Sequence, residues 1–299
     1  MKLVTYSPAS GGTPRPGLVL DDGRIADIPA NAAATPGVDF STMLGIIRGG
    51  AAARKALDAL AARPPAAAGA MADVKLHAPI PRPAKNVFCV GWNYLEHFEE
   101  GAKKLQDNRE LPQWPVFFSK APTAVNGPFD PIPFDPAIST SLDWEVELGV
   151  VIGPGGKDIK AEDAMAHVWG YTVINDVSWR DLQRRHGGQW HKGKSLDGTC
   201  PMGPVLVTAD SLDHTNLRVT CRVNGVTKQD SNTKFLYFKL PRLIHDLSMG
   251  MTLEPGDVIS TGTPEGVGFA RNPPEFLKPG DLLETEIEGI GTLRNPIGG

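Results

Sequence analysis

From residue 75 onward, short apolar runs alternate with glycine and proline, and this pattern restricts the fold more than any other feature. Helix interiors tolerate these two residues poorly, whereas turns and bulges use them. With 33 glycines and 27 prolines, about a fifth of the 299 residues are of these types, which argues against a helical bundle. The apolar runs predict strands at Val87–Gly91, Val116–Phe118, Trp144–Gly153, Gly170–Ile174, Pro204–Val207, Leu217–Val223, Val258–Ser260 and Leu282–Ile287.

Few segments of this region have the spacing of a helix. Because helices do not alternate regularly with the strands, a doubly wound nucleotide-binding fold is disfavoured. The pattern instead favours a β-rich α+β domain of mixed sheets. The helix candidates are residues 94–106, 161–168, 181–186 and 238–248.

The first 75 residues are organised differently. Residues 17–28 predict a hairpin around the turn at Asp21–Gly23, and residues 41–62 predict two short helices. Alanine and proline dominate the segment that follows, which predicts a linker and a domain boundary near residues 63–78. We therefore expect a small α/β domain with its linker over residues 1–75 and a larger domain over residues 76–299.

The formal net charge of −4 is small, and charges of both signs are interspersed. Nothing in it predicts electrostatic binding to nucleic acid or to an anionic membrane. No apolar run reaches the roughly 18 residues of a membrane span, and the first six residues resemble a strand rather than a signal peptide. The three cysteines, Cys89, Cys200 and Cys221, form no pair motif and are expected to be reduced. We expect a cytoplasmic protein with a small polar partner.

Two acids lie two residues apart in the expected strand at 144–153. In a strand, side chains at i and i+2 share a face, so Glu145 and Glu147 point one way and their apolar neighbours the other. Adjacent carboxylates repel unless a cation lies between them, and Mg²⁺ or Mn²⁺, unlike zinc, prefers such oxygen ligands. Asp176 ends another apolar run and could supply a third carboxylate. The alternatives are a solvated edge strand for the pair and a helix N-cap or Asx turn for Asp176.

A histidine and a glutamate share one face of the expected helix at 94–106. His97 and Glu100 are three residues apart, so the carboxylate could fix the imidazole tautomer and raise its basicity. Such a pair can activate water, although a solvated histidine beside acids on a surface helix has the same pattern. The polar residues 101–113 that follow predict a mobile lid.

Residues 188–195 match the phosphate-loop pattern GxxxxGK[ST], but their context does not. A phosphate loop follows a buried strand and opens a helix, whereas polar residues precede this segment and glycine and proline follow it. We therefore reject nucleotide binding and interpret Lys194 as a cation for a substrate carboxylate or an enolate, or as a surface lysine. Residues 260–268 form either a loop that approaches a ligand, with the Thr263 hydroxyl available, or a structural turn.

Together these segments resemble the fumarylacetoacetate hydrolase family, in its fumarylpyruvate-hydrolase-like and acylpyruvase-like branch. The resemblance covers about residues 80–297, whereas residues 1–75 match only as a variable N-terminal domain. It implies the fumarylacetoacetate hydrolase C-terminal-like fold of rolled mixed β-sheets for the catalytic domain, and a homodimer. The matching stretches are VFCVGWNYLEHFEE, PVFFSKAPTAVNGP, LDWEVELGVVIG, GYTVINDVSWRDLQ, GKSLDGTCPMGP and STGTPEGVG.

The resemblance also implies roles for single residues. Arg180 and Asp181 resemble structural residues that support the metal-binding strand. The long segment between residues 100 and 115 departs from the family pattern. The implied residues are Glu145, Glu147 and Asp176 for Mg²⁺ or Mn²⁺, His97, Glu100 and Lys194 for catalysis, and Gln183, Lys194 and Thr263 for substrate contact.

These roles favour hydrolysis of a C–C bond in an acylpyruvate such as fumarylpyruvate. A 2-oxo acid can chelate a cation through its carboxylate and keto oxygens, which stabilises the enolate left after cleavage. His97, oriented by Glu100, would take a proton from the attacking water. The alternatives share the enolate: decarboxylation of oxaloacetate, or isomerisation or hydration of an unsaturated 2-oxo diacid in aromatic catabolism. A non-catalytic protein that binds 2-oxo acids is an alternative of another class.

Overall fold

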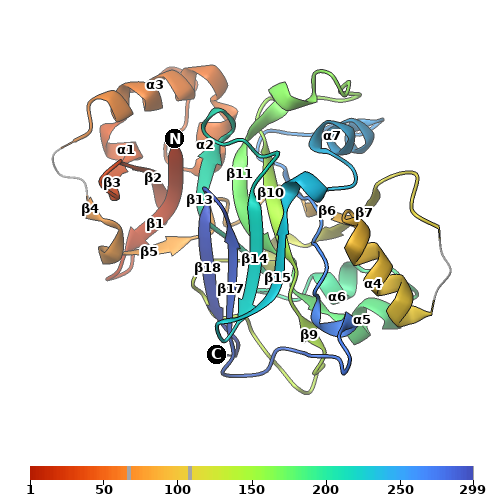
Figure 1. Ribbon diagram of the computed structural model, residues 1–299. Coiled ribbons are helices and arrows are strands. Elements are labelled where there is room, and N and C mark those ends of the chain that lie inside the picture. The colour runs from red at the N-terminus through yellow and green to blue at the C-terminus, as the bar shows by residue number, and fades with distance from the viewer. Residues whose placement is uncertain (66–68, 107–109, 299) are drawn as a thin grey trace.

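The computed structural model describes residues 1–65, 69–106 and 110–298. Its largest element is a twelve-stranded sheet with the order β4-β3-β2-β1-β13-β11-β10-β16-β6-β7, in which β5 also pairs with β1 and β8 with β13 (Figure 1). The twelve strands are β1 (Lys2–Pro8), β2 (Arg15–Val19), β3 (Arg24–Asp27), β4 (Gly69–Ala70), β5 (Val74–His77), β6 (Val87–Gly91), β7 (Val116–Lys120), β8 (Val125–Asn126), β10 (Val146–Ile152), β11 (Val168–Asn175), β13 (Cys200–Thr208) and β16 (Val258–Ser260).

A second, four-stranded sheet with the order β15-β14-β17-β18 packs against the middle of the first, where Figure 1 shows it in front of β10, β11 and β13. Apolar side chains of both sheets form one core, including Val146 and Leu148 of β10 and Val219 and Leu283 of the second sheet. The side chains at alternate positions of β10 therefore point away from this core. The remaining strands are β14 (Arg218–Val223), β15 (Val226–Asn232), β17 (Leu282–Ile287) and β18 (Gly291–Pro296), with β9 (Leu142–Asp143) and β12 (Ser178–Trp179) forming a separate pair.

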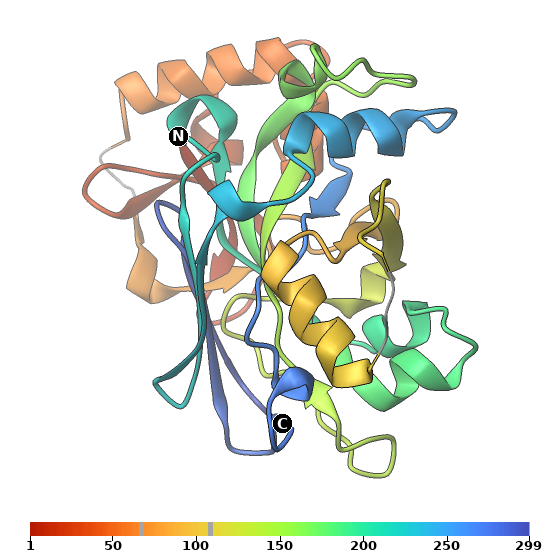
Figure 2. The same ribbon diagram turned by 45° about the vertical axis from the view of Figure 1, so that its right-hand side comes forward.

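The helices are short and lie at the edges of the large sheet. In Figure 2, α3 crosses one end of the sheet, whereas α4, α5 and α6 gather at the far side from the N-terminal strands. The α-helices are α1 (Ile28–Asn31), α2 (Met43–Arg48), α3 (Gly50–Ala62), α4 (Leu95–Leu105), α5 (Arg180–Arg185), α6 (His191–Lys194) and α7 (Leu240–Ser248).

The β-rich α+β architecture is confirmed, as is each strand expected from residue 87 onward. Three of the four helix candidates correspond to α4, α5 and α7 within a few residues. The fourth, residues 161–168, was too long, because only Ala164–His167 coil there, as a 3-10 helix. The short α6 was not expected. It lies inside the segment that matches a phosphate loop, but α5 rather than a buried strand precedes that segment.

The N-terminal hairpin and the helices α2 and α3 form as expected. Strand β1 pairs with β5 and also with β13, so the N-terminal strands continue the large sheet through backbone hydrogen bonds. The division into residues 1–75 and 76–299 stays a prediction. Of the expected linker, residues 66–68 lie outside the described part of the chain.

Residues 101–105 of the expected lid continue α4, and residues 107–109 lie outside the described residues, so a mobile lid stays a prediction. Within the described ranges, no helix is long and apolar enough to cross a membrane. All three cysteines are free and buried, and burial raises the pKa of the Cys200 thiol to about 12, which disfavours a reactive thiolate.

Candidate active site

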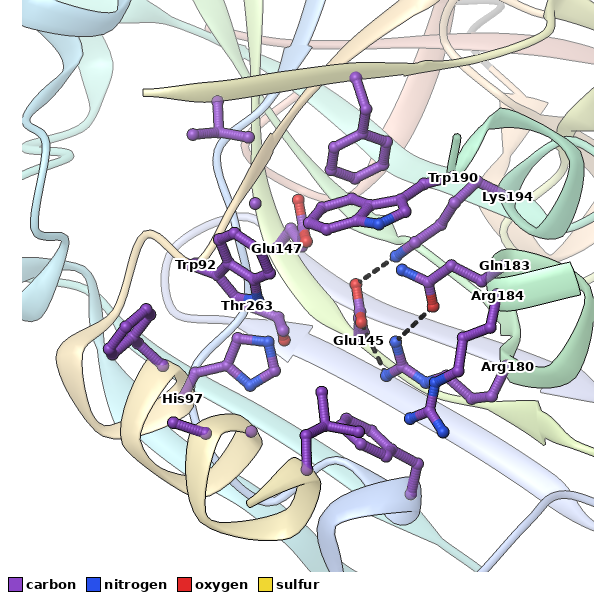
Figure 3. Close-up of a pocket in the computed structure, with 18 residues that line it drawn as sticks. Trp92, His97, Glu145, Glu147, Arg180, Gln183, Arg184, Trp190, Lys194 and Thr263 are labelled. Atoms are coloured by element: carbon purple, nitrogen blue, oxygen red, sulfur yellow. Dashed lines mark hydrogen bonds and ion pairs between the residues drawn. The ribbon is translucent and has the colours of Figure 1, made fainter. Parts of the chain in front are cut away.

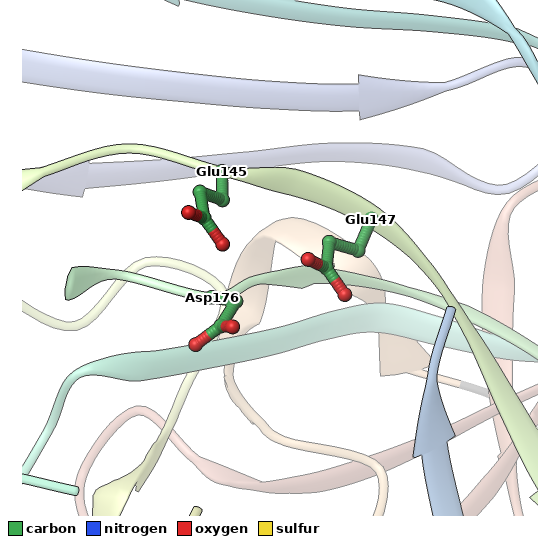
Figure 4. A group of neighbouring side chains, drawn as sticks. All are labelled: Glu145, Glu147 and Asp176. Carbon is green, nitrogen blue, oxygen red and sulfur yellow. The ribbon is translucent and has the colours of Figure 1, made fainter. Parts of the chain in front are cut away.

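Three buried carboxylates meet where β10 begins and β11 ends. The two strands are antiparallel with Val146 opposite Asn175, so the residues just outside them, Glu145 and Asp176, are also neighbours. Glu147 is on the same face of β10 as Glu145, and ligand oxygens of all three acids lie within 4.8 Å of one another (Figure 4). The edge-strand interpretation was wrong, because β10 lies between β11 and β16.

Glu147 is the acid whose charge is least compensated. Its Oε2 accepts hydrogen bonds from Ser260 Oγ at 2.6 Å and from the Gly262 amide at 2.9 Å, both neutral donors. Burial, followed by the charges of Asp176 and Glu145, raises the pKa of Glu147 well above its usual value. Among the described residues, no cationic side chain lies within ion-pair distance of Glu147. A divalent cation would supply that missing charge, and three carboxylates suit Mg²⁺ or Mn²⁺.

Two lysines contact the same carboxylates. The Nζ atom of Lys194, on α6, lies 2.7 Å from both Glu145 Oε2 and Asp176 Oδ2. Lys120, the last residue of β7, donates to Asp176 Oδ1 at 2.8 Å and to the Val177 carbonyl at 3.0 Å. Lys194 is therefore buried against these carboxylates, and the surface-lysine interpretation was wrong. Sequence reasoning missed Lys120, whose only local signal is a lysine two residues after an apolar run.

Arg180 connects the carboxylates to the loop that follows β16. Its Nε donates to Asp143 Oδ2 at 2.8 Å, and its Nη2 forms an ion pair with Glu145 Oε1 at 2.7 Å. Asp143 in turn accepts from the backbone amides of Gly268 and Phe269, at 2.7 and 3.0 Å. Burial by itself would raise the pKa of Glu145, but Lys194 and Arg180 outweigh burial and lower the pKa to about 2. This contact agrees with the structural role expected for Arg180.

The expected pairing of His97 and Glu100 is present on α4. His97 Nδ1 lies 2.9 Å from Glu100 Oε1, and Glu100 Oε2 accepts the Gly266 amide at 2.9 Å. Because an ionised carboxylate only accepts hydrogen bonds, Nδ1 is the donor in this pair, and in the neutral imidazole the lone pair is then on Nε2. Figure 3 shows the His97 ring directed into the same cavity that Glu145 and Glu147 face. A histidine in this position can act as a base toward a bound molecule.

The cavity between α4 and α5 has a volume of about 260 Å³. One wall is aromatic, with Trp190 making edge contacts to Trp92 and Phe118 at ring-centroid distances of 5.0 Å each. Glu100 and Asp176 are not among the residues that line the cavity. The residues expected from the sequence that line the cavity are His97, Glu145, Glu147, Gln183, Lys194 and Thr263. Sequence reasoning missed other lining residues, including Trp92, Phe118, Arg184, Trp190 and Phe269.

The side chain of Thr263 is already engaged within the protein. Its hydroxyl donates to the Val146 carbonyl at 3.0 Å and accepts from Gln229 Nε2 at 2.8 Å. By contrast, Gln183 uses its Oε1 to accept from Arg180 at 3.2 Å, and its amide nitrogen has no partner among the described residues. Gln183 therefore offers a donor to a ligand, whereas the hydroxyl of Thr263 fixes the loop against β10.

Residues 86–298 match the family model described as fumarylacetoacetate (FAA) hydrolase C-terminal. The chain belongs to this family. It is therefore an enzyme of the fumarylacetoacetate hydrolase superfamily, as the sequence motifs implied, and the carboxylate group fits the divalent-metal dependence of that superfamily.

Relatives of this fumarylacetoacetate hydrolase family member carry two kinds of name. Oxaloacetate tautomerase YisK of Bacillus subtilis (strain 168) is 48% identical over 229 residues, which are 76% of this chain and 74% of the relative. The mitochondrial oxaloacetate tautomerase fahd2 of Xenopus laevis is 43% identical over 300 residues, 99% of this chain and 90% of the relative. A maleylpyruvate hydrolase from Sphingobium sp. SYK-6, solved with manganese(II) and pyruvate, superposes with a TM-score of 0.77 at 30% identity, covering 100% of this chain and 99% of that one.

The relatives favour the oxaloacetate alternative over hydrolysis of an acylpyruvate, because both curated relatives are named as oxaloacetate tautomerases. The geometry alone is compatible with either reaction, because both reactions need a base and a carboxylate group that face one cavity, and this cavity has them. The roles of the individual site residues stay predictions.

Proposed function

We propose that this protein interconverts the keto and enol forms of a 2-oxo diacid, with oxaloacetate as the substrate and Mg²⁺ or Mn²⁺ as the cofactor. The observation that carries the proposal is the placement of His97 Nε2 in one cavity with Glu145 and Glu147. A base and an electrophilic centre on opposite sides of a substrate are what enolisation requires. The names of the relatives support the choice of oxaloacetate.

Glu145, Glu147 and Asp176 would hold the cation. When bound, the cation supplies Lewis acidity that polarises the C2 carbonyl of a 2-oxo acid. Lys194, which lines the cavity at Glu145, adds positive charge near the C2 oxygen as negative charge develops there. The neutral donor groups around Glu147 keep that carboxylate oriented toward the cavity.

His97 would perform the proton transfer. Its Nε2 takes a proton from C3 of the keto form, and the C–H electron pair becomes the C2–C3 double bond. The C2 oxygen gains the charge and then takes a proton from water, and the imidazolium of His97 gives its proton to the hydroxide that remains. This completes the enol and restores the base, and the reverse sequence returns the keto form. Glu100 stabilises the imidazolium that forms, because its carboxylate lies 2.9 Å from Nδ1. No attacking water is needed for this reaction.

Hydrolysis of an acylpyruvate is the second candidate. The same dyad could activate water against the distal carbonyl, and the maleylpyruvate hydrolase neighbour was solved with pyruvate, which is a product of that type of cleavage. Decarboxylation of oxaloacetate would also release pyruvate. These reactions differ in their products, so one assay separates them.

The experiment mixes purified protein and Mg²⁺ with oxaloacetate, acetylpyruvate and fumarylpyruvate, and follows enol absorbance together with pyruvate release. A tautomerase accelerates the change in enol absorbance of oxaloacetate without releasing pyruvate. Pyruvate from the acylpyruvates would instead support hydrolysis, and pyruvate from oxaloacetate would support decarboxylation. If the wild-type protein tautomerises oxaloacetate no faster than the His97→Ala protein does under the same conditions, the proposal is wrong.

Further expectations are attached to this proposal. A homodimer and a role in aromatic catabolism follow only from the resemblance, a cytoplasmic location follows only from the sequence pattern, and all three stay predictions. The partner that the site itself supports is a small 2-oxo acid.

A further inference from the structure

Helix α5 presents three polar side chains to the cavity. Arg180, Gln183 and Arg184 have the spacing i, i+3 and i+4, which places them on one face of a helix, and all three line the cavity. Asp181 and Arg185 lie outside the lining and pair with each other at 3.2 Å. An apolar binding site would not place two arginines on one wall, so this wall is suited to a polar or anionic ligand.

The two arginines differ in how their charges are compensated. Arg180 is paired with Asp143 and Glu145, at 2.8 and 2.7 Å. Arg184 has no acidic partner within ion-pair distance among the described residues. Its guanidinium lies over the Phe269 ring, 5.0 Å from the centroid, and the same ring contacts Arg180 at 4.9 Å. Phe269 therefore holds Arg184 in place without neutralising it.

The environment of Arg184 favours an anion beside it. Burial, followed by the charge of Arg180, lowers the pKa of Arg184 from its ordinary value, in line with the lack of an acidic partner among the described residues. An incoming carboxylate would offset that cost and could bind the planar guanidinium through two hydrogen bonds. Figure 3 shows Arg184 across the cavity from His97 and on the same side as Arg180 and Gln183.

A 2-oxo diacid has two charged ends, and only one has a defined place so far. The end that carries the C1 carboxylate and the C2 oxygen belongs at Glu145 and Glu147, where the cation would be held. The C4 carboxylate then needs a cation on another wall. Lys194 is already bound to Glu145 and Asp176, and Arg180 to Asp143 and Glu145. Arg184 is the cavity-lining cation, among the described residues, that has no such partner.

We propose that Arg184 binds the second carboxylate of the substrate and so makes the enzyme selective for 2-oxo diacids over 2-oxo acids with an uncharged distal end. This inference rests on the proposed function, because it uses the orientation of a chelating 2-oxo acid. It adds a specificity-determining residue that the sequence motifs do not assign.

The test compares two ligands that differ only at the distal group, oxaloacetate and its C4 amide, 2-oxosuccinamate. Calorimetric titration of the Mg²⁺-loaded protein gives a dissociation constant for each. The wild-type protein is expected to bind the diacid at least about tenfold more tightly, because a charge-assisted pair is lost with the amide. The variant Arg184→Gln should reduce this preference to about one.

The matched control is Arg185→Gln. Arg185 is adjacent on α5 but pairs with Asp181 outside the cavity, so its removal should leave the preference unchanged. Arg184→Lys, which keeps the charge but not the planar fork, should retain part of the preference. A native thermal transition for each variant shows that the comparison is made on folded protein.

Two results would overturn the inference: a preference for the diacid that survives in Arg184→Gln, or a wild-type protein that binds both ligands equally. Failure of the proposed function is distinguishable. Suppose that the wild-type protein does not accelerate tautomerisation, but that it prefers the diacid and the Arg184→Gln variant does not. Arg184 then still binds the distal carboxylate, and only the proposed reaction is wrong. If tautomerisation is confirmed and the preference is unaffected, only the role of Arg184 is wrong.

Discussion

The Nζ atom of Lys120 lies 2.8 Å from Oδ1 of Asp176, and neither side chain is exposed to solvent. The two residues are 56 positions apart and come from β7 and from the end of β11. Lys194 occupies the other oxygen of Asp176 at 2.7 Å. Asp176 is therefore held by a lysine on each oxygen, which fixes the plane of its carboxylate beside Glu145 and Glu147.

The buried ion pair makes Lys120 a determinant of stability. Lys120→Met keeps the length of the side chain but leaves Asp176 Oδ1 without its cation in a site closed to water. We expect the free energy of unfolding to fall by roughly 3 kcal/mol, as measured by chemical denaturation. Lys75→Met is the control, because Lys75 and Asp130 form a pair at 2.9 Å that is partly exposed and should contribute less than about 1 kcal/mol. Equal losses in the two variants would contradict this account.

His97 and Glu100 are predicted to control turnover without holding the cation. His97→Ala should lower kcat by about 10²–10⁴ because the base is lost. Glu100→Gln should lower kcat by about 10–100-fold, since the amide no longer stabilises an imidazolium on His97. Glu99→Gln on the exposed face of α4 is the control and should leave kcat unchanged. Loss of Mg²⁺ binding in His97→Ala, measured by calorimetry, would assign His97 to the metal site instead.

Metal binding is predicted to stabilise the protein more at high pH than at low pH. The folded pKa of Glu147 is raised above its value in the unfolded chain, so the folded protein without a cation is destabilised as pH rises and the carboxyl ionises. A cation favours the ionised form and releases that proton. Added Mg²⁺ or Mn²⁺ should therefore raise Tm more at about pH 8 than at about pH 5.5. At a cation concentration a hundredfold above Kd, the free energy of unfolding should rise by about 2.7 kcal/mol.

The matched variant for this experiment is Glu147→Gln, which keeps the hydrogen-bonding oxygen near Ser260 but loses the charge. It should show little metal-dependent change in Tm at either pH. A chelator that leaves the Tm of the metal-loaded wild-type protein unchanged at both pH values would count against a metal site at these carboxylates.

Close packing between α5 and α6 predicts that replacing Gly193 destabilises the protein. A Cβ atom at Gly193 would lie 2.4 Å from the Gln183 amide nitrogen and 2.6 Å from its Cα, so the helices would have to separate. Gly193→Ala should cost about 1–3 kcal/mol of stability and raise KM, because Gln183 and Lys194 shift together. Gly101→Ala is the control, since nothing lies within 4 Å of its Cβ position and alanine favours the α4 helix by about 1 kcal/mol. Similar stability of the two variants would show that α6 can move freely.

Local periodicity explains what the sequence predicted correctly. The alternation in residues 144–153 places Val146 and Leu148 in the core and Glu145 and Glu147 on the opposite face, because side chains of a strand alternate. The spacing of His97 and Glu100 likewise predicts their hydrogen bond, because i and i+3 are neighbours on a helix. These features depend on residues close together in the chain, and the family motifs added their roles.

The sequence by itself therefore predicted the strands that carry the site, the dyad and the three carboxylates, whereas the tertiary structure decided what surrounds them. In the sequence, Lys120 is a lysine shortly after an apolar run, and Arg184 is one of several charged residues in a short expected helix. Lys120 matters because it is buried beside Asp176. Arg184 matters because it lies over Phe269 and has no acidic partner among the described residues. Both environments arise from packing between segments that are distant in the sequence. The energy of a charged group depends on its exposure to water and on its charged neighbours, and only the packing sets these.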